Sequence, residues 1–227
     1  MTTQVCVSVS GTDVHEIIGR VQQAERLSAN LVEVRLDRMR SHQGLSKISR
    51  AAGTPLIATN RPLSEQGSYR GPEQERRAIL QEAAGEGFEY VDLEDTTPNL
   101  ARMTKIIRQK GARIILSHHD NFRTPTQSGL ARIFSQLQKQ KPDIYKIVTT
   151  AKTSDDSLAI LQFLEANRRT GSLVGFAMGK SGVWSRVLAP FHGSAFTYTS
   201  LARGMETAPG QPTISELRHI YELLGLE

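Results

Sequence analysis

The chain has 227 residues, of which 38% are hydrophobic and 22% charged, and its formal net charge is +5. A length of this order suits one large domain or two small ones, and the composition is that of a globular protein. Because no run of about 18 apolar residues occurs, we expect no membrane-spanning helix. The single cysteine, Cys6, excludes an intrachain disulfide framework and a cysteine-rich zinc site.

The start of the chain bears on the location of the protein, and the distribution of charge bears on the kind of partner that it binds. The first ten residues move directly into a predicted strand without a signal-peptide pattern, so we expect a cytoplasmic protein. The basic residues are dispersed rather than gathered in one long run. The positive charge therefore favours a small anionic substrate or a solvated surface over a nucleic acid partner.

Short apolar runs alternate with helical patterns along the chain. The runs are 5–9, 31–36, 56–59, 90–93, 114–116, 144–148, 173–178 and 195–201. Apolar residues recur at helical spacing between most of them, in 14–27, 73–84, 100–107, 130–137 and 158–164. Two helices have to be short, because they must fit within 44–52 and 184–190.

This alternation predicts an α/β protein with a parallel sheet. Eight strand–helix units in one chain predict a single-domain (β/α)8 TIM barrel over residues 1–227. A doubly wound open sheet is the alternative, although residues 10–13 after the first strand lack the glycine fingerprint of a dinucleotide fold. Helix caps are predicted at Thr97 and Thr124, which precede prolines, and a capping box begins at Thr213.

Lys146 lies in the middle of the predicted strand 144–148. Strand side chains alternate between faces, so Ile144, Lys146 and Val148 share one face. If both faces are buried, the amine is buried as well, and an unpaired buried ammonium is costly. Desolvation favours a neutral, nucleophilic amine, which would explain such a lysine. An exposed lysine on an edge strand is the other interpretation.

The same alternation puts further polar side chains on the inner face near the strand ends, where TIM barrels hold their active sites. They are Ser8, Ser10, Glu33, Arg35, Thr59, Arg61, Asp92, Glu94, Ser117 and His119. Any one of the charges could form an isolated salt bridge at the rim. Together with Lys146 they suit an enzyme that forms a Schiff base, in which a histidine moves protons and arginines hold a carboxylate. No metal is expected, because the iminium is the electron sink.

Seven motifs, in the right order over essentially the whole chain, carry a resemblance to a known family. They are VEVRLD (32–37), TNR (59–61) with Glu65, SHHD (117–120) followed by TP (124–125), DIYK (143–146), MGKSGVWSR (178–186), GSA (193–195) and APGQ (208–211). The chain resembles type I 3-dehydroquinate dehydratase, the Schiff-base dehydroquinase of the shikimate pathway.

The resemblance implies a reaction and its catalytic residues. Lys146 would form an imine with the ketone of 3-dehydroquinate. His119 would remove the neighbouring proton and then protonate the leaving hydroxyl, and Glu65 would orient His119. The products of this syn elimination are 3-dehydroshikimate and water. The resemblance also implies a homodimer, and a reaction without metal or cofactor.

The resemblance further implies a set of substrate-binding residues. Arg186 would bind the carboxylate, while Glu33, Arg35 and Arg61 would hold the ring hydroxyls and balance the local charge. The remaining members are Ser8 on the first strand, Met178 and Tyr198 as apolar walls, and Thr207 and Gln211 on a loop that closes over the substrate. Glycines at 67, 71 and 210 indicate that the closing loops are mobile.

Two other functions are compatible with parts of this pattern. A class I aldolase or another Schiff-base lyase would need the lysine-bearing strand alone. A non-enzymatic protein could have kept the barrel and lost its chemistry, but the intact charged set argues against this.

Overall fold

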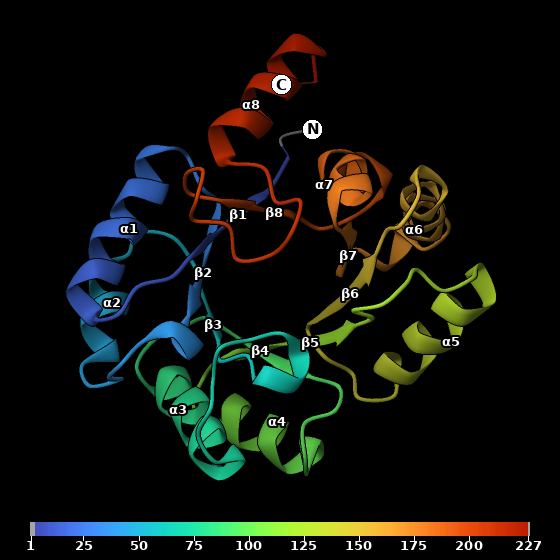
Figure 1. The fold of residues 1–227 in the computed structure, drawn as a ribbon. Coiled ribbons are helices and arrows are strands. Elements are labelled where there is room, and N and C mark those ends of the chain that lie inside the picture. Colours follow the sequence, from blue (N-terminus) through green and yellow to red (C-terminus); the bar gives the residue numbers. More distant parts are fainter. Residues whose placement is uncertain (1–2, 227) are drawn as a thin grey trace.

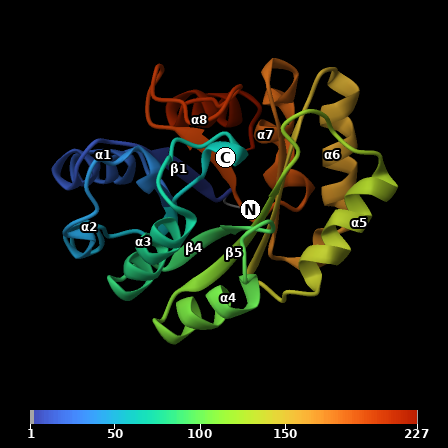
Figure 2. The ribbon, with the colours of Figure 1, turned by 60° about the horizontal axis from the view of Figure 1, so that its bottom comes forward.

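The computed structural model describes residues 3–226, in which a ring of strands is surrounded by helices (Figures 1 and 2). The strands are β1 (Val5–Val9), β2 (Leu31–Arg35), β3 (Leu56–Thr59), β4 (Tyr90–Glu94), β5 (Arg113–His119), β6 (Ile144–Thr150), β7 (Leu173–Met178) and β8 (Thr197–Ser200). The helices are α1 (Val14–Arg26), α2 (Leu45–Ala51), α3 (Glu73–Gly85), α4 (Leu100–Gln109), α5 (Gln127–Gln138), α6 (Ser154–Ala166), α7 (Val183–Leu188) and α8 (Ile214–Leu223). Among residues 3–226, no helix is both long enough and apolar enough to cross a lipid bilayer.

All eight strands form one parallel sheet in the order β7-β6-β5-β4-β3-β2-β1-β8. The two strands at the ends of this order meet at their beginnings, where the Ala195 amide donates to the Leu173 carbonyl at 2.8 Å. The sheet is therefore a nearly closed barrel. This confirms the predicted TIM barrel and excludes the doubly wound alternative.

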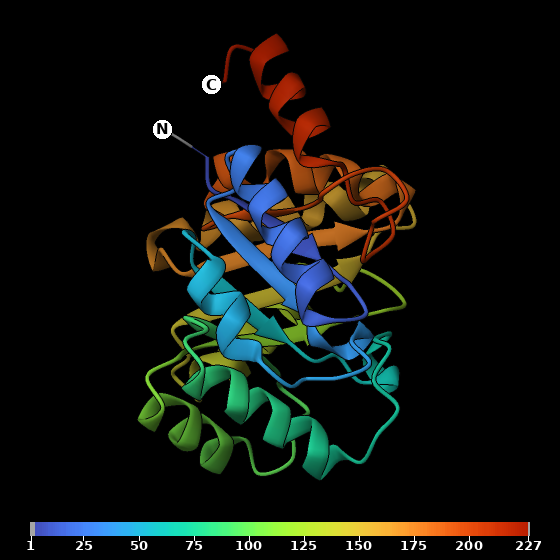
Figure 3. The same cartoon turned by 90° about the vertical axis from the view of Figure 1, so that its left-hand side faces the viewer.

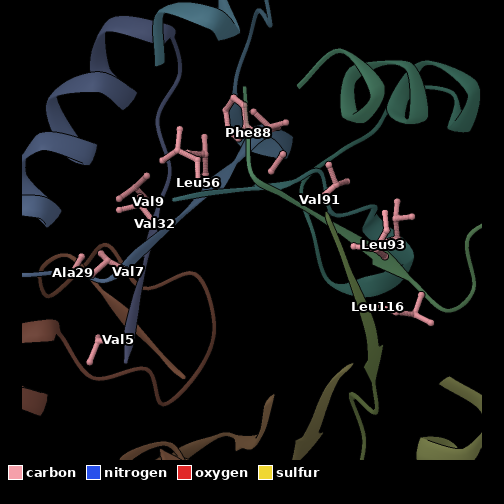
Figure 4. Packing of buried hydrophobic residues seen from close by; sticks show 14 of the residues in the cluster. Val5, Val7, Val9, Ala29, Val32, Leu56, Phe88, Val91, Leu93 and Leu116 are labelled. Carbon is pink, nitrogen blue, oxygen red and sulfur yellow. The ribbon is translucent and has the colours of Figure 1, made fainter. Parts of the chain in front are cut away.

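Side-chain alternation divides the apolar core into two clusters. Val5, Val7 and Val9 belong to the outer cluster between sheet and helices, part of which is shown in Figure 4. Cys6, which lies between them in sequence, belongs to a separate inner cluster. Burial of each large aliphatic side chain contributes about 1.5–3 kcal/mol, so the alternation strongly favours one register. It also decides which polar side chains face the interior of the barrel.

Two of the three predicted helix caps are wrong. Helix α4 begins after Asn99 rather than at Thr97, and α5 begins after Thr126 rather than at Thr124. The Thr124 hydroxyl instead bonds to the Thr149 hydroxyl at 2.9 Å, so a tertiary contact outcompetes the local cap. The capping box at Thr213 is confirmed.

The carboxyl ends of the parallel strands all face one side of the barrel. The loop between β3 and α3 and the loop between β8 and α8 both lie on this side, as Figure 3 shows. TIM barrels have their active sites at this end, built from the ends of the strands and the loops that follow, because the interior of the barrel is filled with packed side chains.

Candidate active site

One pocket opens at the carboxyl ends of the strands, and all twelve residues predicted for the site line it. The lining consists of Ser8, Glu33, Arg35, Thr59, Arg61, Glu65, Gln66, His119, Asn121, Lys146, Val148, Phe176, Met178, Arg186, Tyr198, Thr207, Ala208, Pro209 and Gln211. Strand alternation accounts for those on strands. The two loops described above contribute most of the others, while Asn121 comes from the loop after β5 and Arg186 from helix α7. The sequence motifs therefore converge in space, whereas the roles of the residues stay predictions.

Lys146 is buried on the inner face of β6, as the alternation predicts, and only 4% of its surface is exposed. Its Nζ lies 2.8 Å from Asp92 Oδ2, 3.6 Å from Glu33 Oε1 and 3.2 Å from the Tyr198 hydroxyl. Two carboxylates thus contact the amine, and such neighbours stabilise an ammonium. The buried amine is therefore paired with acidic groups, which the sequence patterns did not place beside it.

Asp92 is the main residue that sequence reasoning missed. Strand alternation puts Asp92 on the inner face of β4, but the family resemblance assigns it no role. In the structure its Oδ1 lies 3.0 Å from Arg61 Nη2 and accepts from the Ser117 hydroxyl at 2.6 Å. Burial opposes ionisation of Asp92, but Arg61 and then Lys146 outweigh it and hold its pKa well below the ordinary value. Asp92 therefore stays a carboxylate in the interior.

Arg61 continues the chain of buried charges away from the pocket. Its Nη1 donates to Glu94 Oε1 at 2.7 Å, and Glu94 Oε2 accepts from Arg76 Nη1 at 2.9 Å. Burial opposes the charge on Arg61, but Asp92 and Glu94 outweigh it and raise its pKa. Charges of opposite sign alternate in this network, so each buried ion has a partner.

His119 lies in the pocket with its Nδ1 3.9 Å from Glu65 Oε2. This separation is too long for a hydrogen bond, and the buried Nδ1 has no partner among residues 3–226. Burial, assisted by Arg61 and Lys146, lowers the His119 pKa well below its ordinary value, so the ring is neutral near pH 7. Burial also raises the pKa of Glu65, whose Oε1 accepts from the Thr96 hydroxyl at 3.1 Å.

Arg186 is the most exceptional charged group in the pocket. Its side chain is 1% exposed, and its Nε and Nη2 have no hydrogen-bond partner within residues 3–226. Cζ lies 4.2 Å from the centre of the Phe176 ring, a cation–π contact that compensates only part of the lost hydration. Burial lowers the pKa of Arg186 to about 9. An unpaired buried guanidinium that lines a pocket suits an anionic ligand.

Glu33 and Arg35 on β2 are both engaged within the protein. Glu33 accepts from the Thr59 hydroxyl at 3.0 Å and also from the Ser8 hydroxyl. Arg35 donates from Nε and Nη2 to the two oxygens of Asp37, each at 2.8 Å. Arg35 therefore has a fixed orientation, with two of its five N–H donors occupied by Asp37.

The loop after β8 is fastened to the loop after β7. Gln211 Oε1 accepts from the Thr207 amide at 2.9 Å and from its hydroxyl at 3.2 Å. Gly210 has a φ of +73°, and a Cβ there would lie 2.3 Å from the Gly179 carbonyl oxygen. A Cβ at Gly67 would lie 2.0 Å from the Arg61 carbonyl oxygen. Both glycines are required for close backbone approach, which is a different reason from the predicted mobility.

Comparison with known proteins agrees with this geometry. A model of the family described as "Type I 3-dehydroquinase" matches residues 5–227. The chain belongs to the type I 3-dehydroquinase family. This is a family of hydro-lyases, and the chain is therefore an enzyme of that class, as predicted.

Individual members of the type I 3-dehydroquinase family resemble the chain over most of its length. A 3-dehydroquinate dehydratase of Dehalococcoides mccartyi is 33% identical over 215 residues, which are 93% of this chain and 95% of the relative. One of Desulfotalea psychrophila is 35% identical over 196 residues, or 85% and 86% of the two chains. The crystal structure of 3-dehydroquinate dehydratase from Geobacillus kaustophilus, 25% identical, superposes with a TM-score of 0.89 over 99% of this chain and 92% of that one.

Proposed function

We propose that the protein converts 3-dehydroquinate into 3-dehydroshikimate and water by syn elimination through a Schiff base on Lys146. The observation that carries the proposal is the buried Lys146 amine in the pocket, with the Glu33 carboxylate 3.6 Å away as an acceptor for its proton. Family membership supports the overall reaction, a step of the shikimate pathway.

The first stage joins substrate and enzyme. Lys146 gives a proton to a carboxylate partner, and its nitrogen attacks the ketone carbon. A C–N bond forms, and the ketone oxygen leaves as water. The resulting iminium withdraws electrons from the neighbouring C–H bond and so acidifies it.

The second stage is the elimination. A neutral His119 accepts the proton from the carbon next to the iminium, which leaves an enamine. His119 then returns this proton to the departing hydroxyl, so a second water forms and the histidine is neutral again. Hydrolysis of the imine consumes one water and frees Lys146, and the net change is the loss of one water.

Arg186 binds the substrate carboxylate in this proposal. Bidentate hydrogen bonds between a guanidinium and a carboxylate are short and directional. The two unpartnered nitrogens of Arg186 and its lowered pKa support this role. A bound carboxylate would accept hydrogen bonds from these nitrogens, and its negative charge would stabilise the charged guanidinium.

The remaining pocket residues would align these groups and enclose the substrate. Glu65 would orient His119 once the gap between them closes on substrate binding. Four residues would contact the ring or balance charge, namely Ser8, Glu33, Arg35 and Arg61. Met178 and Tyr198 would form walls, and Thr207 and Gln211 would cover the substrate. The homodimer and the cytoplasmic location stay predictions.

The direct test is turnover of 3-dehydroquinate by the purified protein. Dehydration produces an enone, so near-ultraviolet absorbance rises, whereas a class I aldolase would produce two smaller fragments. We expect the rise with wild-type protein and with Lys152→Ala, an exposed lysine just after β6, and no rise with Lys146→Ala. Turnover by Lys146→Ala at the wild-type rate, or no turnover by folded wild-type protein, would overturn the proposal.

A further inference from the structure

The hydroxyl group of Tyr198 touches the amine that the proposed reaction uses. Lys146 Nζ lies 3.2 Å from this hydroxyl and 4.2 Å from the centre of the same ring. Resemblance assigned Tyr198 to an apolar wall, and its ring does pack against Phe176 and Phe196, with centroid distances of 5.7 and 5.4 Å. The hydrogen bond between this hydroxyl and the amine is a second, polar contact, and an apolar wall residue would not require it.

The direction of this hydrogen bond follows from the groups involved. An ammonium has three donors and no acceptor, so Lys146 donates and the Tyr198 oxygen accepts. The hydroxyl keeps its own proton, which no residue within 3–226 accepts in a hydrogen bond. Tyr198 lines the pocket and is only 3% exposed. Its proton is therefore free to be donated to a bound molecule.

The surroundings keep this proton on the oxygen at rest. Burial, together with the nearby carboxylate of Glu33, raises the pKa of Tyr198 well above its ordinary value. A standing phenolate is thus excluded near pH 7. The hydroxyl is suited to passing a proton on while receiving another, which leaves it uncharged before and after.

We propose that Tyr198 is a catalytic residue in imine formation and hydrolysis, where its hydroxyl relays a proton from Lys146 nitrogen to the ketone oxygen of the substrate. This inference rests on the proposed Schiff-base function. Once the C–N bond forms, the reacting oxygen lies two bonds from Nζ, an atom that already contacts the hydroxyl.

The relay balances without an external acid. The nitrogen attacks the ketone carbon, the π electrons move to oxygen, Tyr198 gives its proton to that oxygen and takes one from nitrogen, and a carbinolamine results. The proton that Lys146 first gave to the Glu33 carboxylate then returns to the carbinolamine oxygen. Water leaves, and the iminium keeps one N–H. The three protons of the ammonium end as one on the iminium and two on water.

Tyr198→Phe tests the relay because it removes one oxygen and keeps the ring under Nζ. We expect borohydride trapping of substrate on Lys146 to become at least about tenfold slower, at or below the low end of general acid–base effects. With substrate deuterated at the carbon that loses its proton, the isotope effect on kcat should be closer to one in Tyr198→Phe than in the wild type, because imine formation limits the rate of the variant. Affinity for a substrate analogue without the ketone should stay within twofold of wild type.

Tyr145→Phe is the matched control. Tyr145 precedes Lys146 on β6 but faces the outer cluster, where its ring packs edge-on against Phe134 at 5.1 Å. We expect it to trap at the wild-type rate. Equal trapping rates and isotope effects in Tyr198→Phe and wild type would overturn the relay and leave the Schiff base intact. Absence of any adduct in the wild type would instead overturn the proposed function.

Discussion

Lys146 Nζ and Asp92 Oδ2 lie 2.8 Å apart in the interior of the barrel, although they are 54 residues apart in sequence. Arg61 holds the other oxygen of Asp92. Asp92 is therefore the carboxylate that compensates two buried cations. Its removal affects the stability of the barrel and leaves the reactive amine without its nearest carboxylate.

Asp92→Asn should destabilise the protein by about 3–5 kcal/mol, the usual cost of breaking a buried ion pair from one side. Denaturant unfolding measures this change. The control is Glu89→Gln, which removes an exposed partner of Arg113 and should cost no more than about 1 kcal/mol. Equal effects of the two substitutions would contradict the structural role of Asp92.

The contribution of Asp92 also depends on pH with a defined sign. Its pKa is lower in the folded protein than in the unfolded chain. The stabilisation is therefore complete above the unfolded pKa of about 3.9 and is lost as the pH falls towards the folded value. The stability difference between wild type and Asp92→Asn should be constant from pH 5 to 7 and shrink below about pH 4. A difference that grows on acidification would contradict this account.

Arg186→Met should separate binding from stability. Loss of the guanidinium removes the proposed partner of the substrate carboxylate, so KM should rise by about 10² or more, equivalent to the ~3 kcal/mol of a charged hydrogen-bonded pair. Without substrate the same change should leave the free energy of unfolding unchanged or raise it, because an unpartnered buried cation disappears. Arg169→Met, at an exposed position, serves as the control for KM. A large loss of stability with an unchanged KM would show that Arg186 is structural.

His119→Ala should form the imine but turn over about 10²–10⁴-fold more slowly, the range for loss of general acid–base catalysis. His118→Ala is the control, because His118 pairs with Asp95 at 2.7 Å and does not line the pocket. The lowered pKa of His119 keeps the neutral base available as the pH falls. The acidic limb of kcat/KM should therefore lie below the ordinary histidine value of about 6.5. An acidic limb of kcat/KM above about pH 6.5 would contradict the assignment of His119 as the general base.

Gly67→Ala should impair catalysis by displacing the backbone of the loop that carries Glu65. A Cβ at this position would overlap the Arg61 carbonyl oxygen, so the loop that carries Glu65 has to move. We expect kcat/KM to fall at least about tenfold, since small misplacements of catalytic groups are costly. Gly19→Ala in α1 is the control, because a Cβ there meets no atom within 4 Å. It should leave activity unchanged and stabilise the protein by about 0.5–1 kcal/mol.

The face on which each strand residue lies could be read from the sequence, but its partner across the barrel could not. Lys146 and Asp92 were both placed inside by two-residue alternation, which the strand pairing confirms. Their contact depends on the tilt of the strands and the length of the lysine, neither of which is encoded locally. Local patterns also misled at Thr124, where a tertiary hydrogen bond replaces the cap.

The most direct test of the central claim is the mass of the peptide that contains Lys146 after borohydride is added together with 3-dehydroquinate. The account predicts a mass increase on this peptide equal to the reduced substrate or product adduct, and none on the peptide that contains the exposed Lys105. An unmodified Lys146 peptide, in folded protein that turns the substrate over, would contradict the Schiff-base mechanism.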